Sequence, residues 1–98
     1  MTDLERLQKA IKDLHGLEGF HVMSMQVNEI FEGKTVWTGL VEVFKVDHHP
    51  QAKYAFAWSY KDDDDKSHYV AVLGVPPVNT PEDAVRAYIV AQAEKKGK

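Results

Sequence analysis

Residues 53–61, Lys-Tyr-Ala-Phe-Ala-Trp-Ser-Tyr-Lys, decide the fold, because large and small side chains alternate along them. A period of two is typical of a β-strand, whose successive side chains point to opposite faces of a sheet. The large side chains therefore share one face: Tyr54, Phe56, Trp58 and Tyr60. The alanines and the serine between them occupy the other face, where a helix backbone could come close. We predict a central strand here.

One helix is predicted at each end of the chain. Thr2 and Glu5 match the Thr-x-x-Glu capping box, apolar residues at three- and four-residue spacing follow, and Gly16 is placed to end this helix near residue 15. The second helix begins at Thr80-Pro81-Glu82-Asp83, an N-cap threonine followed by proline and two acids, and is expected to run to about residue 95.

Three further strands are predicted at residues 20–31, 35–46 and 68–75, where β-branched, aromatic and alternating residues dominate. Glu32-Gly33-Lys34 supplies the turn between the first two. The strand at 35–46 is apolar on both sides. Either both of its faces are covered, or a bulge near Gly39 shifts the register.

The predicted fold is α+β. It is a four-stranded antiparallel β-meander flanked by an N-terminal and a C-terminal helix (α-β-β-β-β-α), with both helices on one face of the sheet. Residues 1–98 are expected to form a single small domain, since a chain of 98 residues is of ordinary domain size.

The amino-acid composition and net charge argue against several classes of function. With 44% hydrophobic and 28% charged residues, the chain resembles a soluble globular protein. The net charge of -3 and the lack of a long basic stripe argue against binding of duplex nucleic acid, whose phosphates attract Lys and Arg. No apolar run is long enough to cross a membrane or to follow a basic leader region, so neither secretion nor membrane insertion is expected.

The sequence contains no cysteine, which excludes disulfides, a thiol nucleophile and a Cys-ligated zinc site. This composition fits a reducing compartment, and we expect a cytoplasmic protein. Asp47-His48-His49 suggests metal ligands, but adjacent residues of an extended segment point in opposite directions. We therefore predict no metal site and no cofactor.

No catalytic residue is predicted. Ser24, Ser59, His21 and His68 stand outside any nucleophile–base motif, and the glycines are too scattered to form a phosphate-binding loop. The chain is accordingly interpreted as non-enzymatic.

Four consecutive aspartates at 62–65 predict a solvated hairpin tip, because like charges repel and aspartate has a low strand propensity. With its flanks the run reads Tyr-Lys-Asp-Asp-Asp-Asp-Lys over residues 60–66, and it resembles the FLAG epitope and the enteropeptidase recognition sequence. An inserted tag is therefore one interpretation. We favour a native turn, because the flanking strands continue without a break.

The function is predicted from the aromatic face. If both helices cover the alanine side of the central strand, an open apolar surface remains: Tyr54, Phe56, Trp58, Tyr60, Leu40 and Phe44. Self-association as a homodimer, or binding of a protein partner, would bury it. The alternatives are a platform for single-stranded nucleic acid, which the nearby aspartates disfavour, and a carrier of a small apolar ligand.

Overall fold

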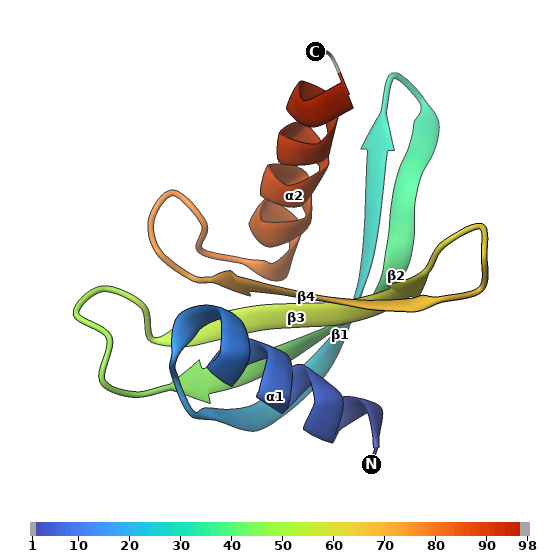
Figure 1. The fold of residues 1–98 in the computed structure, drawn as a ribbon. Coiled ribbons are helices and arrows are strands. Elements are labelled where there is room, and N and C mark those ends of the chain that lie inside the picture. Colours follow the sequence, from blue (N-terminus) through green and yellow to red (C-terminus); the bar gives the residue numbers. More distant parts are fainter. Residues whose placement is uncertain (1, 97–98) are drawn as a thin grey trace.

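The computed structural model describes residues 2–96, and their side chains as far as residue 92. The elements along the chain are α1 (Asp3–His15), β1 (Gly19–Phe31), β2 (Lys34–Val46), β3 (Tyr54–Lys61), β4 (Ser67–Leu73) and α2 (Pro81–Lys96) (Figure 1). The strands form one antiparallel sheet in the order β1-β2-β3-β4. The predicted α+β fold and its element order are confirmed. Residues 1, 97 and 98 of the predicted domain lie outside the described residues.

Local sequence signals explain where the helices begin and end. The Thr2 hydroxyl accepts from the Glu5 amide and the Glu5 carboxylate accepts from the Thr2 amide, both at 3.2 Å, so the capping box is formed. Gly16 takes a left-handed conformation with φ 70° and closes α1. At α2, the Asp83 amide donates to the Thr80 hydroxyl at 3.1 Å. Neither helix within residues 2–96 is long and apolar enough to cross a membrane.

The two helices cover opposite faces of the sheet, so the prediction that they share one face is wrong. On one face Leu7 and Ile11 of α1 pack against residues of the sheet: Phe44, Ala55, Ala57 and Ala71. On the other face Ala84 and Val85 of α2 pack against a second set of sheet residues: Val41, Val43, Phe56 and Trp58. Register pairs such as Phe44 with Ala55 and Val43 with Phe56 place the two clusters on alternate sides of the same strands. Because β2, β3 and β4 are apolar on both sides, both faces need a helix.

The sheet divides into two hairpins beyond its centre. Strands β2 and β3 pair only between Glu42–Lys45 and Tyr54–Ala57, whereas β1 stays paired with β2, and β3 with β4, well beyond that point. Figure 1 shows the β1–β2 hairpin extending away from β3 and β4, with α2 beside its upper part. Trp58 lies where the strands separate and is 1% exposed. Trp37 and Tyr88 contact it edge-on, with ring centroids 5.7 and 5.5 Å away.

The irregularity in β2 lies near Val36 rather than near Gly39. The register between β1 and β2 shifts at Glu29/Ile30, opposite Val36, and again at His21/Met23. Gly39 is regularly paired, and a Cβ there would lie 3.1 Å from the Trp37 ring, which crosses its backbone. In the second half of β2, residues 41–46, both faces are covered by helices, which is the first of the two explanations given for its apolar faces.

Candidate functional site

The six residues predicted to form an open aromatic surface do not form one. Phe56 and Trp58 are 3% and 1% exposed, because α2 packs on them. Phe44 is buried on the opposite face, under α1. Only Tyr54, Tyr60 and Leu40 are exposed. The ring faces of Phe56 and Trp58 are therefore unavailable both to a partner chain and to stacked bases.

Exposed apolar residues gather instead at the end of the β1–β2 hairpin. Ile30 and Phe31 at the end of β1 are 63% and 66% exposed. With neighbouring residues of β2 and α2 they line a groove of about 520 Å³. We call it the hairpin-end groove, and its apolar residues are Ile30, Phe31, Val36, Ile89 and Val90. Its walls thus come from three elements, the adjacent strands β1 and β2 and the helix α2, which is far from them in sequence.

An ion pair lies beside the apolar walls of the hairpin-end groove. The Glu29 carboxylate, with its side chain 9% exposed, lies 2.8 Å from Nε of Arg86 on α2. That N–H is poorly aligned with the Glu29 Oε1 atom, which has no well-formed hydrogen bond despite the short distance. Arg86 also lies 3.8 Å from Asp83 one turn earlier. The pair joins β1 to α2 and neutralises the one carboxylate of β1.

The beginning of β1 carries a second set of exposed apolar side chains: Phe20, Val22 and Met23. Val22 is the extra residue at the His21/Met23 register shift. Between the two apolar ends, the strand exposes polar side chains, and Gln26 donates to Asn28 and to Thr38 of β2 at 3.3 and 3.2 Å. Strand β1 is therefore polar at its middle and apolar at both ends.

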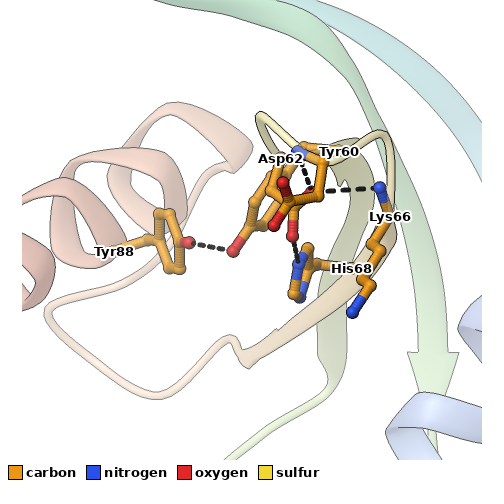
Figure 2. A network of polar contacts seen from close by, with 6 residues as sticks. Tyr60, Asp62, Lys66, His68 and Tyr88 are labelled. Carbon is orange, nitrogen blue, oxygen red and sulfur yellow. Dashed lines mark hydrogen bonds and ion pairs between the residues drawn. The ribbon is translucent and has the colours of Figure 1, made fainter.

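A polar network connects the β3–β4 turn to α2 (Figure 2). The Tyr88 hydroxyl donates to the Tyr60 hydroxyl at 3.1 Å, and the Tyr60 ring stacks on His68 with centroids 5.0 Å apart. His68 Nε2 lies 2.7 Å from the Asp62 carboxylate, whose other oxygen accepts from the Lys66 amide at 3.0 Å. The first aspartate of the acidic run thus has a structural role, whereas the following three are exposed.

The same network shifts two pKa values. The hydrogen bond with His68, and then that from the Lys66 amide, holds the pKa of Asp62 below its ordinary value of 3.8. Burial, and then the hydrogen bond with Tyr60, raises the pKa of Tyr88 to about 12. The lowered pKa favours the ionised carboxylate of Asp62, which accepts hydrogen bonds, and the raised pKa favours the neutral hydroxyl of Tyr88, which donates one.

His48 and His49 lie in the turn between β2 and β3, and His49 accepts hydrogen bonds that stabilise this turn. The Ala52 and Gln51 amides donate to His49 Nδ1 at 2.8 and 3.1 Å, and His48 has a left-handed φ of 66°. Within the described part of the chain, no three His, Asp or Glu side chains gather in an arrangement suited to a metal ion.

The hairpin-end groove was missed by sequence reasoning, although a signal for it exists. Odd-numbered positions of β1 are the apolar ones at its middle, but the even-numbered Phe20, Val22 and Ile30 at its ends are apolar as well. The register shift at Val22 places Phe20, opposite Lys45, on the other face from Ser24 and Gln26. Apolar residues at both ends of a strand that exposes polar residues at its middle indicate a surface that the chain does not cover by itself.

Comparisons with known proteins add no relative. No family model, no curated protein and no solved structure matches this chain.

Proposed function

We propose that this protein is a non-enzymatic interaction module that self-associates, and that the hairpin-end groove and the adjoining strand β1 form its contact surface. The observation that carries the proposal is the exposure of Ile30 and Phe31 at 63% and 66%, next to a fully buried core. Monomeric proteins rarely expose contiguous apolar surface of this kind. The proposed contact surface is therefore on β1 and not on the aromatic face of β3, because α2 covers that face.

The energetics of burying the groove favour a weak affinity between the two copies. Burial of one large apolar side chain contributes about 1.5–3 kcal/mol, and roughly half of that is still to be gained by a half-exposed one. Two copies that each bury four such residues would gain on the order of 6–12 kcal/mol, which is similar to the 4–15 kcal/mol that association costs. The groove alone therefore supports weak dimers, and a stable dimer requires further contacts along β1.

For the compartment we propose the cytoplasm. A chain without cysteine is compatible with reducing conditions.

Light scattering with sedimentation equilibrium tests the proposal. The wild-type chain should change from monomer to dimer as its concentration rises to about 500 µM, the range expected for weak dimers. Phe31→Glu should weaken this equilibrium by about tenfold or more, because it places a charge in the interface, while circular dichroism stays unchanged.

Leu14→Glu is the matched control, because Leu14 is also a large exposed apolar residue, 61% exposed, but lies on α1 and not in the hairpin-end groove or on β1. It should leave the equilibrium unchanged. A wild-type chain that stays monomeric throughout, or equal weakening by both variants, would refute the proposal.

The groove itself favours a second candidate function, that of a carrier for a small apolar ligand. Its volume of about 520 Å³ falls within the range of ligand pockets, and its walls are mostly apolar. The probe 1-anilinonaphthalene-8-sulfonate should then fluoresce with the wild-type chain and not with Val90→Arg, whose charge enters the groove. Equal fluorescence of both proteins would exclude the groove as the site.

A further inference from the structure

We infer that the outer edge of β1 pairs antiparallel with β1 of a second copy, across a two-fold axis at Gln26, so that the two sheets become one. This inference rests on the proposed self-association, because it specifies which contacts form the interface. It concerns the backbone edge of β1, whereas the groove supplies side-chain contacts at the ends of that edge.

The first observation is that the two edges of the sheet are protected unequally. Strand order places β1 and β4 at the edges. Strand β4 has 7 residues, and the aspartate run ends two residues before its first residue, Ser67. Strand β1 has 13 residues, contains no proline, lysine or arginine, and has Glu29 as its one carboxylate. Folded proteins usually protect a long edge with charge, proline or a cover, since its free N–H and C=O groups are a template for another strand. Strand β1 has neither the proline nor the exposed charge that would protect it in this way.

The second observation identifies the occupant as another copy of this chain. The exposed apolar side chains of β1 lie at its two ends, Phe20 to Met23 at the beginning and Ile30 with Phe31 at the end. Antiparallel pairing of two identical strands brings the beginning of each against the end of the other. Each apolar end then meets an apolar end, and the polar middles face one another. Because Glu29 is buried beside Arg86, no exposed like charges are brought together.

The position of the axis follows from the register. Strand β1 is regularly paired with β2 from Met23 to Glu29, between its two register shifts, and Gln26 is the middle of that segment. An axis there places Ser24 opposite the partner's Asn28 and Met25 opposite the partner's Val27. Around the axis, polar residues then face polar residues and apolar residues face apolar ones. At the ends of the regular segment Met23 lies opposite the partner's Glu29, whose carboxylate is paired with Arg86 of its own chain.

A cysteine at the axis tests this geometry directly, because the chain has no cysteine of its own. Directly opposed residues of an antiparallel pair have Cα atoms about 4.5–5.5 Å apart, which suits a disulfide. Under mild oxidation Gln26→Cys should form a disulfide-linked dimer. Ser67→Cys, an exposed position at the opposite edge of the sheet, should stay largely monomeric on a non-reducing gel.

A charge at the axis provides the second arm. Gln26→Lys places two like charges opposite each other and should weaken the dimer about tenfold in light scattering, with an unchanged circular dichroism spectrum because Gln26 is exposed. Gln26→Ser is the neutral control and should dimerise as the wild type does.

The outcomes separate this inference from the proposed function. If the wild type dimerises but Gln26→Cys is linked no faster than Ser67→Cys, edge pairing at Gln26 is refuted and self-association stands. If the wild type remains monomeric, both are refuted. Faster linkage of Gln26→Cys together with weakening by Gln26→Lys is the expected result.

Discussion

Truncation of Phe56 to alanine measures how firmly α2 covers the aromatic face of β3. Phe56 is 3% exposed, lies opposite Val43 of β2 and Val72 of β4, and belongs to the cluster that includes Val85 of α2. Replacing a buried phenylalanine by alanine costs about 3–5 kcal/mol, through lost burial and the cavity left behind. Small domains have a total unfolding free energy of about 5–15 kcal/mol. The variant should therefore lose a large part of its stability, and its melting midpoint should fall by at least about 12 °C.

Urea unfolding, followed by tryptophan fluorescence and circular dichroism at one protein concentration, measures the change. Tyr54→Ala is the matched control, because Tyr54 lies on the same face of the same strand but is 44% exposed. Its unfolding free energy should change by about 0.5–1 kcal/mol. If Phe56→Ala cost no more than Tyr54→Ala, α2 would not cover this face, and the aromatic surface expected from the sequence would be open after all.

Two further predictions concern the polar network of Figure 2. Because the pKa of Asp62 is lowered in the folded state by its hydrogen bond with His68, the stabilisation it contributes is present above its ordinary value of 3.8 and is lost as the pH falls through the folded value. The difference in unfolding free energy between wild type and Asp62→Asn should therefore shrink below about pH 4, and a constant difference would contradict this. Asp63→Asn, at an exposed position of the same turn, is the control and should change the unfolding free energy at pH 7 by no more than about 0.5 kcal/mol. The pKa of Tyr88 is raised to about 12, so its hydroxyl should ionise well above the ordinary tyrosine value of about 10 in an ultraviolet titration that compares the wild type with Tyr88→Phe. The unfolding free energy should fall between about pH 10 and 12, and Tyr88→Phe should reduce that fall.

Element type and order could be predicted from the sequence, because each depends on local chemistry. The Thr2–Glu5 capping box, the left-handed Gly16 and the alternation around Phe56 need no tertiary contact to be recognised. The face that α2 covers could not be predicted in the same way. Residues 70–73 of β4 are apolar on both faces, which indicates two covers but does not say which helix lies where. That choice depends on the path of residues 74–80 and on the packing of α2, which are properties of the whole fold.

The candidate site was misplaced for the same reason. Alternation placed Tyr54, Phe56, Trp58 and Tyr60 on one face, and the structure confirms that arrangement for the strand. Whether that face is open depends on α2, and burial of Phe56 and Trp58 reverses the functional conclusion. Strand β1 has an exposed surface because β1 and β2 are longer than β3, and these lengths depend on tertiary pairing rather than on local sequence.

Unequal strand lengths explain why β1 is the part of this fold that a second chain can complete. Strands β1 and β2 have 13 residues each and β3 has 8, so the strands of the first hairpin are five residues longer than β3, which is roughly 16 Å of extended chain at about 3.3 Å per residue. Pairing of β2 with β3 ends at Glu42 and Ala57, and beyond that point the hairpin has no neighbouring strand within residues 2–96. Among residues 2–96, helix α2 covers one of its faces there, and no strand pairs with the outer edge of β1. A hairpin with one covered face and an open edge is stabilised most by another strand, and β1 of a second copy has the required length and a matching arrangement of apolar ends.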